Sequence, residues 1–214
     1  MKILFELRTA INVSGNSFLT LSHGNKRVKQ YFEGLMTVKG LLSTYIKQSK
    51  CDVVLVDNTL INDSFLPDSI SQAVPNDSYL YVKQKNDYGK YNKGAGDIEL
   101  WKDYSEILED YDYFFHYEPR MLLKDSSFIK SFIDNPRNCF CLAGENQVKT
   151  GYFGVNVKDF KEFYEQVDLN DMVSRYISIE YMMFDFFKNK EVEFQKDKHY
   201  CLWHDAANDQ YVEY

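Results

Sequence analysis

The fold class of this chain is decided by residues 91–120, YNKGAGDIELWKDYSEILEDYDYFFHYEPR. The stretch opens with a turn that contains two glycines, which allow a close approach of the backbone. Apolar residues then recur at roughly helical spacing over 98–108. The aromatic residues of 111–115 favour a strand, and Pro119 ends it. A helix that leads into a buried strand in this way is typical of an open α/β sheet.

The rest of the chain supplies further strands and helices around this stretch. Strands are expected over residues 2–7, 51–56, 79–82, 139–143, 152–157, 192–194 and 200–203. Helices are expected over 27–48, 128–133, 160–163 and 177–187, and a polar tail is expected from His204 onward. The strand at 51–56 is apolar almost throughout, as in a parallel sheet buried on both faces. We therefore expect an α/β fold with a mixed, mainly parallel sheet flanked by helices.

Length and charge limit the possible classes of protein. A chain of 214 residues is long enough for one sizeable core, so we expect one domain over residues 1–214. The net charge of −7 counts against a broad, non-specific grip on nucleic acid, which relies on neutralising phosphates. The lysines within 83–93 form either a local basic strip or a solvated loop face.

The cysteines and the apolar pattern indicate a soluble protein in a reducing compartment. The four cysteines have no spacing typical of a zinc ribbon or a redox pair, so we expect buried thiols. The start MKILFELRTA is too short and too charged for a signal peptide, and no apolar run approaches the length of a membrane span.

Titratable residues follow two of the predicted strands. Asp57 comes after the strand at 51–56, and His116 and Glu118 lie at the end of the aromatic strand. Ligands of open α/β sheets collect at the carboxyl ends of the strands, so these side chains indicate an enzyme site. Asp57 either contacts a ligand or caps its own turn. Glu118 contacts a metal ion or a sugar, or it forms a salt bridge with Arg120, whereas His116 is as readily a core residue.

Another candidate site lies at the start of the helix that follows the glycine turn. Asn92, Lys93 and Gly94 precede this helix, whose N-terminal N–H groups attract anions. The alternative is a plain helix start with a surface lysine. Asp97 lies in the first helical turn, where a carboxylate is stabilising in any case.

A further acidic residue, Glu180, lies in the apolar segment SIEYMMFDFF. A partly desolvated glutamate has a raised pKa and can accept the proton of an attacking hydroxyl. The alternative is a buried carboxylate that is paired with Arg175 or Lys188.

The order of these elements resembles the GT-A type of nucleotide-sugar glycosyltransferase, a Rossmann-like fold, and more loosely its family 2-like branch. DVVLVDNTLIND at 52–63 is similar to the family strand that ends in an Asp-x-x-Ser/Thr turn. YNKGAGDIELW at 91–101 is similar to its Asn-x-Gly helix start, and YDYFFHYEPRMLL at 111–123 takes the place of its strand ending in Asp-x-Asp. Some virus- and capsule-associated relatives also combine an Asn-Lys-Gly helix start with a strand that ends in an arginine.

The resemblance implies roles for the candidate residues. Residues 1–124 would bind the nucleotide-sugar and 125–214 the acceptor. The expected nucleotide-sugar contacts are Asp57, Asn92, Lys93, Gly94, Asp97 and Arg120. A divalent metal, Mn or Mg, would be held by Glu118, His116 and His204, unless Arg120 offsets the phosphate charge without a metal. Glu180 would act as the general base, and Glu118 would help to manage the charge of the leaving group.

The function implied by this resemblance is that of a glycosyltransferase, and the simpler mechanism is inverting. The acceptor would be a glycan, or a hydroxymethylated base in phage DNA. The chain would be cytoplasmic, in the host cytoplasm if it is viral. Two alternatives stay open: a nucleotidyltransferase on a similar sheet, and a non-catalytic module that binds a nucleotide or a sugar.

Overall fold

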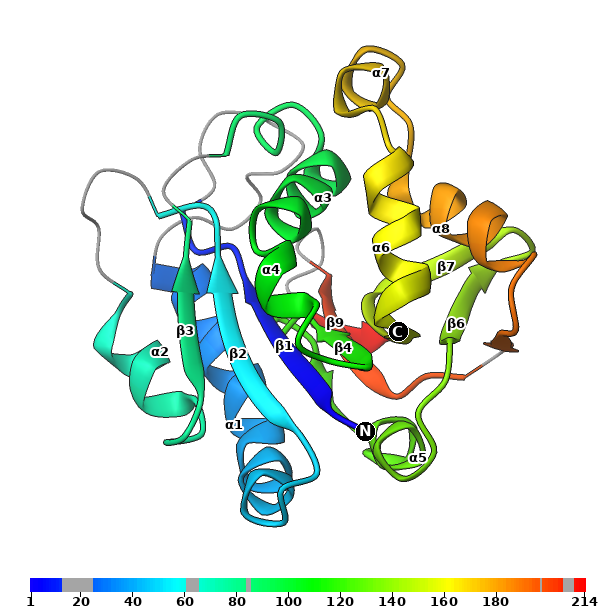
Figure 1. Ribbon diagram of the computed structural model, residues 1–214. Helices are drawn as coiled ribbons and strands as arrows, with labels where there is room; N and C mark the ends of the chain where they lie inside the picture. The colour runs from blue at the N-terminus through cyan, green and yellow to red at the C-terminus, as the bar shows by residue number, and fades with distance from the viewer. Residues whose placement is uncertain (13–24, 61–65, 84–85, 197, 206–209) are drawn as a thin grey trace.

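A seven-stranded sheet forms the centre of the molecule (Figure 1). The computed structural model describes residues 1–12, 25–60, 66–83, 86–196, 198–205 and 210–214. The strand order is β3-β2-β1-β4-β7-β6-β8. The bounds are β1 (Ile3–Thr9), β2 (Asp52–Asp57), β3 (Tyr79–Val82), β4 (Tyr113–Tyr117), β6 (Cys139–Gly144), β7 (Gln147–Asn156) and β8 (Glu193–Gln195). The first four of these strands are parallel, and β7 is antiparallel to both of its neighbours.

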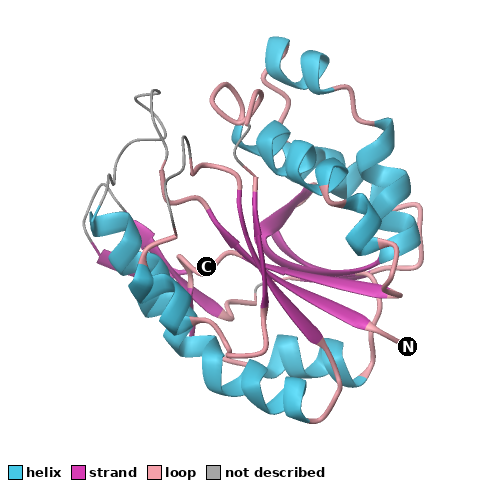
Figure 2. Ribbon diagram, turned by 60° about the vertical axis from the view of Figure 1, so that its left-hand side comes forward, coloured by secondary structure: helices cyan, strands magenta, loops and turns pink. Residues whose placement is uncertain are grey.

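Helices cover both faces of this sheet (Figure 2). One face packs against α1 (Asn25–Lys47), α2 (Asp68–Ala73) and α5 (Ser127–Asp134). The other face packs against α3 (Lys93–Asp103), α4 (Ser105–Leu108), α6 (Val157–Gln166), α7 (Leu169–Ser174) and α8 (Ile179–Phe187). A second, three-stranded sheet consists of β5 (Leu122–Leu123), β9 (Cys201–Asp205) and β10 (Gln210–Glu213), in the order β10-β9-β5. The architecture thus confirms the expected fold class.

Successive side chains of the buried strands point to opposite faces of the sheet and so contribute to two separate cores. In β1, Phe5 and Leu7 face the core under α1, while Leu4 faces the core under α3. Phe5 stacks on Phe115 of β4, with 4.8 Å between the ring centroids. Because β1 is buried along its whole length, it has apolar residues on both faces.

The structure differs from the sequence expectation in its shorter elements. The expected polar tail after His204 contains β10, which pairs with β9 as an antiparallel hairpin. The short elements α2, α7 and β5 were not expected, because so few residues show no clear hydrophobic period. The cysteine prediction is confirmed: all four thiols are free and buried.

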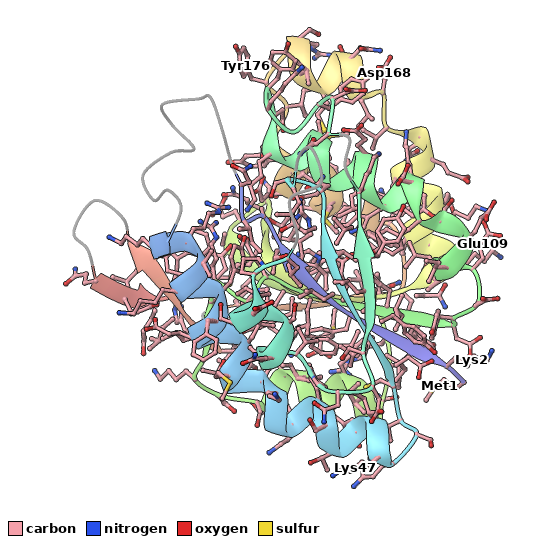
Figure 3. All side chains as sticks on the ribbon, turned by 90° about the vertical axis from the view of Figure 1, so that its left-hand side faces the viewer. Met1, Lys2, Lys47, Glu109, Asp168 and Tyr176 are labelled. Atoms are coloured by element: carbon pink, nitrogen blue, oxygen red, sulfur yellow. The ribbon has the colours of Figure 1, made fainter. Side chains whose placement is uncertain are left out.

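The topology places the carboxyl ends of β1, β2, β3 and β4 at one edge of the sheet. Tyr176, just after α7, and Lys47, at the end of α1, lie at opposite ends of the molecule (Figure 3). Within the described residues, no helix has the length and apolar character needed to cross a membrane.

Candidate functional site

Charged side chains gather where β1, β2 and β4 end and α3 begins. The cationic members are Arg8, Arg27, Lys93 and Arg120, and the carboxylates are Asp57, Asp97 and Glu118. We call these residues the carboxyl-edge cluster. Four cations thus lie at this edge of a chain whose net charge is −7, and an exposed cation such as Lys93 suits an anionic ligand.

Glu118 occupies the centre of the cluster, directly after β4. Its Oε1 accepts a hydrogen bond from Nε of Arg120 at 2.7 Å, and its Oε2 accepts one from Nζ of Lys93 at 3.0 Å. Only 5% of the residue is exposed. Burial alone would raise the pKa of Glu118, but the charges of Arg120 and Lys93 hold it well below its ordinary value. The carboxylate is therefore ionised at neutral pH.

Arg120 is fixed from several sides. Its guanidinium carbon lies 4.7 Å from the ring centroid of Trp203, and although burial lowers its pKa, the charge of Glu118, with a smaller effect from Tyr31 of α1, raises it. Helix α1 approaches the turn at 118–120 so closely that a Cβ on Gly34 would overlap the carbonyl oxygen of Pro119. The glycine at position 34 thus permits the contact that holds Arg120 in place.

The start of α3 carries Lys93 next to this turn. Asn92 is the N-cap of α3, and its Oδ1 accepts a hydrogen bond from the N–H of Ala95 at 3.2 Å. Its Nδ2 donates to the carbonyl oxygens of Met172 at 3.2 Å and Ile177 at 3.0 Å. The predicted helix start therefore also holds α3 against α7 and against the segment that connects α7 to α8.

Gly94 serves the packing of two helices at this helix start. A Cβ on Gly94 would lie 2.7 Å from Cβ of Ile179, at the start of α8. The side chain of Lys93, by contrast, is 45% exposed and can reach a ligand.

Arg8 joins the ends of β1 and β2 to α3. Its Nη2 donates to Oδ1 of Asn58 at 2.6 Å and to Oδ1 of Asp97 at 2.9 Å. Asn58 in turn donates from Nδ2 to the carbonyl oxygen of Gly96 at 2.9 Å. Asp97 thus pairs with an arginine that the sequence analysis did not single out. The available signal was an arginine that directly follows the predicted strand at 2–7.

Asp57 is buried and bound within the protein. Its Oδ2 accepts hydrogen bonds from Oγ1 of Thr9 at 2.8 Å and the N–H of Ile11 at 3.1 Å. Its Oδ1 accepts from the N–H of Thr59 at 2.6 Å and from the Thr59 hydroxyl at 2.7 Å. A carboxylate has about four acceptor positions, so a nucleoside would have to displace one of these partners. A contact between Asp57 and a nucleoside remains a prediction.

His116 belongs to a buried polar network on the α3 face of the sheet. Its Nδ1 lies 2.5 Å from Oε1 of Glu6, whose carboxylate also accepts hydrogen bonds from Trp101 and Tyr104. The imidazole stacks on Phe153, with 5.0 Å between the ring centroids. Different partners therefore hold the side chains of His116 and Glu118.

Among the described residues, the predicted metal ligands are bonded to other protein groups and do not fit a divalent metal ion. Both carboxylate oxygens of Glu118 are bonded to cations, and the Nδ1 atom of His116 faces Glu6. The side chain of His204 lies outside the described part of the chain. Among the described residues, no group of three His, Cys, Asp or Glu side chains could hold a metal.

Glu180 lies near the same edge, at the start of α8. Its Oε1 accepts a hydrogen bond from Oγ1 of Thr150 in β7 at 3.3 Å, and its Oε2 accepts one from Oγ of Ser178 at 2.5 Å. Burial, and then the charges of Glu118 and Glu180, raise the pKa of the Tyr214 hydroxyl. Thr150 is followed by Gly151, whose carbonyl oxygen accepts a hydrogen bond from the N–H of Glu118 at 2.7 Å, so Glu180 lies at the same edge of the sheet as Glu118.

The expected alternative partners of Glu180 are engaged elsewhere. Arg175 pairs with Asp171 at 3.1 Å, and Lys188 pairs with Asp185 at 2.7 Å. Both of these pairs lie on the exposed surface.

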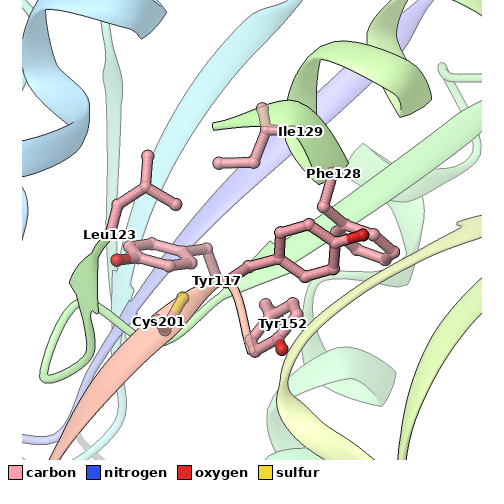
Figure 4. Close-up of a pocket in the computed structure, with 7 residues that line it drawn as sticks. Tyr117, Leu123, Phe128, Ile129, Tyr152 and Cys201 are labelled. Carbon is pink, nitrogen blue, oxygen red and sulfur yellow. The ribbon is translucent and has the colours of Figure 1, made fainter. Parts of the chain in front are cut away.

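A small apolar hollow lies apart from the charged groups, between α5, β4 and β9 (Figure 4). It has a volume of about 160 Å³, including space that is open to solvent, and it is too narrow for a water molecule. Its lining is Tyr117, Leu123, Phe128, Ile129, Tyr152, Tyr200 and Cys201. We regard this hollow as part of the core packing.

Comparisons with known proteins give no match by sequence. No protein-family model matches the chain, and no curated protein sequence matches it. Solved structures do match. A protein from Desulfovibrio desulfuricans G20, assigned as a nucleotide-diphospho-sugar transferase, has a TM-score of 0.51 and 10% identity over 91% of this chain and 79% of its own.

Two further structures share the fold. Core-mannan synthase A from Aspergillus fumigatus, in its Mn/GDP form, has a TM-score of 0.51 and 9% identity over 90% of this chain and 72% of its own. A protein from Bacillus anthracis, assigned as a glucose-1-phosphate thymidylyltransferase and in complex with sucrose, has a TM-score of 0.50 and 11% identity over 96% of this chain and 89% of its own. The chain therefore has the mixed, mainly parallel GT-A-like fold that these nucleotide-sugar transferases share.

Proposed function

We propose that this chain transfers a glycosyl group from a nucleoside-diphosphate sugar to an acceptor hydroxyl, as an inverting glycosyltransferase. The observation that carries the proposal is the carboxyl-edge cluster, in which Lys93 and Arg120 flank Glu118. Fixed cations at the carboxyl ends of parallel strands suit a ligand with charged phosphates. The likeness to nucleotide-diphospho-sugar transferases supports this ligand class at the level of the fold.

The two parts of the chain take different substrates in this proposal. Residues 1–124 bind the donor, and residues 125–214 bind the acceptor. Asp57 shapes the nucleoside site through its hydrogen bonds to the ends of β1 and β2. Lys93 and the first N–H groups of α3 receive the diphosphate, while Asn92 and Gly94 set the position of this helix. Asp97 acts through Arg8, which it holds in place.

The reaction is a direct displacement at the anomeric carbon. Glu180 accepts the proton of the acceptor hydroxyl while the oxygen attacks this carbon from the side opposite to the diphosphate. The bond from the anomeric carbon to the diphosphate oxygen then breaks, and the nucleoside diphosphate leaves. Lys93 and Arg120 stabilise the negative charge that develops on it. A single displacement of this kind inverts the anomeric configuration.

The charge distribution of the protein favours a glycan hydroxyl, rather than a nucleic acid, as the acceptor. Lys83, in the basic segment that a nucleic acid would use, is only 12% exposed. It pairs with Glu99 at 3.5 Å and Asp103 at 3.3 Å, so its charge is neutralised within the protein. A hydroxymethylated base in DNA is the second acceptor to test, because a modified base also offers a free hydroxyl.

The proposal is tested with the full chain and a panel of UDP-, GDP- and TDP-sugars, by thermal shift and by donor hydrolysis. We expect one donor to raise the melting temperature and to be hydrolysed slowly in the absence of an acceptor. Glu180→Gln should lower turnover by about 10²- to 10⁴-fold and leave donor affinity unchanged. Asp185→Asn, on the exposed side of the same helix, is the matched control and should keep full activity.

Three outcomes would contradict the proposal. They are no response to any nucleotide, full activity in Glu180→Gln, and a product that retains the anomeric configuration of the donor. Formation of pyrophosphate from a nucleoside triphosphate and a sugar phosphate would identify a nucleotidyltransferase instead.

A further inference from the structure

We propose that this chain binds the diphosphate of its donor without a divalent metal ion, with Lys93 and Arg120 supplying the positive charge and Glu118 holding both of them in position. This inference rests on the proposed function and specifies how the same site recognises its substrate. It concerns the neutralisation of the diphosphate charge, for which a metal-dependent transferase uses a bound cation.

The first argument is that each carboxylate oxygen of Glu118 already has a charged protein partner. Each of its carboxylate oxygens is bonded to one cation, at 2.7 Å for Arg120 and 3.0 Å for Lys93. A metal ion that took this carboxylate would leave the Arg120 side chain, which is only 15% exposed, without its charged partner. Breaking a buried ion pair in this way is strongly unfavourable.

The second argument is charge equivalence. A carboxylate bound to two monovalent cations has the same net charge as a carboxylate bound to one divalent cation. Lys93 and Arg120 around Glu118 therefore present to a phosphate the net charge that a carboxylate-bound divalent metal would present. Arg27 adds to this field, since its charge also lowers the pKa of Glu118.

The third argument is that both cations are placed to meet a phosphate. Arg120 uses Nε for Glu118, which leaves other N–H donors of its planar guanidinium to bind phosphate oxygens. Trp203 supports the flat face of this group. Lys93 is 45% exposed at the first residue of α3, so its ammonium and the helix N-terminus face the same region.

The experiment is calorimetric titration of the full chain with UDP, GDP and TDP, in EDTA and then in Mn²⁺ or Mg²⁺. We expect the nucleotide that binds most tightly to have the same Kd within about threefold in all three solutions. In EDTA, Lys93→Ala and Arg120→Ala should each weaken binding by about 10- to 100-fold, the effect of losing one charged hydrogen bond. Arg120→Lys should recover part of the loss, because it restores the charge but not the fork of donors.

Arg137→Ala is the matched control. Arg137 also forms an arginine–glutamate pair, with 2.6 Å from Nε to Oε2 of Glu193, but it precedes β6 at the opposite edge of the sheet. The Arg137→Ala variant should bind the nucleotide with the same Kd as the wild type. Lys93 is exposed, so its variant tests the inference even if Arg120→Ala fails to fold.

The outcomes separate the two proposals. Binding that disappears in EDTA and returns with Mn²⁺ or Mg²⁺ overturns this inference and leaves the proposed function intact. Metal-independent binding that Lys93→Ala and Arg120→Ala do not weaken also overturns it. If no nucleotide binds in any solution, the proposed function fails and this inference fails with it.

Discussion

Glu118 and Arg120 are only two residues apart, yet they form a closed ion pair, with 2.7 Å between Oε1 and Nε. Pro119, which lies between them, restricts the backbone of the turn after β4. Helix α1 packs on this turn through Gly34. The geometry of the pair is thus set by the short sequence Glu-Pro-Arg together with one distant glycine.

The lowered pKa of Glu118 predicts a specific dependence of stability on pH. Because the folded pKa lies below the ordinary glutamate value of about 4.3, the stabilisation is complete above that value. It is lost as the pH falls from there through the lowered pKa of Glu118. We expect Glu118→Gln to be about 3 kcal/mol less stable than the wild type at pH 7, with a difference that shrinks below pH ~4. Urea unfolding at several pH values measures this difference.

Glu193→Gln is the control for this series. Glu193 also pairs with an arginine, but its side chain is 41% exposed, so its removal should cost no more than about 1 kcal/mol. A Glu118→Gln difference that stayed constant from pH 7 to pH 3 would count against an ionised, paired Glu118.

Two glycines of α1 make a matched pair for testing the contact with Arg120. A Cβ at Gly34 would overlap the Pro119 carbonyl, whereas nothing lies within 4 Å of a Cβ at Gly40. Gly34→Ala should therefore destabilise the protein by about 1–3 kcal/mol and weaken nucleotide binding by moving Arg120. Gly40→Ala should stabilise it by about 0.5–1 kcal/mol, the ordinary gain within a helix. Equal effects of the two changes in thermal unfolding would show that the α1 contact is unimportant.

The cysteines should be unreactive in the native protein. Burial raises the pKa of the Cys51, Cys139 and Cys201 thiols to about 12 and that of Cys141 to about 11. The reactive thiolate is therefore scarce at pH 8, and reagent access is poor. We expect Ellman's reagent to label the chain at the rate of unfolding, and to label all four thiols at once in guanidinium chloride. Rapid labelling of the native chain would contradict this burial.

The sequence predicted those helices and strands whose own residues show a clear local pattern. The apolar run of β2, the helical spacing in α3 and the aromatic run of β4 each follow from local preferences, so the sheet and its flanking helices could be predicted. The sequence also singled out Glu118 and Lys93, and it raised a salt bridge between Glu118 and Arg120 as an alternative.

The remaining contacts of the site depend on chain segments that are far apart. Tyr31 of α1 and Trp203 of β9 meet Arg120 only after the second sheet and α1 have packed beside the turn. The pairing of His116 with Glu6 needs the register of β1 against β4. No spacing within the sequence encodes such tertiary contacts.

Amide hydrogen exchange of the full chain, with and without a saturating nucleoside diphosphate, locates the binding site directly. If the nucleotide binds where β1, β2 and β4 end, we predict slower exchange in residues 92–97, at the start of α3, and in 117–121, around Glu118 and Arg120. Unchanged exchange in these two segments, with protection confined to α5 or to the exposed edge strand β3, would contradict a nucleotide site at the carboxyl edge of the sheet.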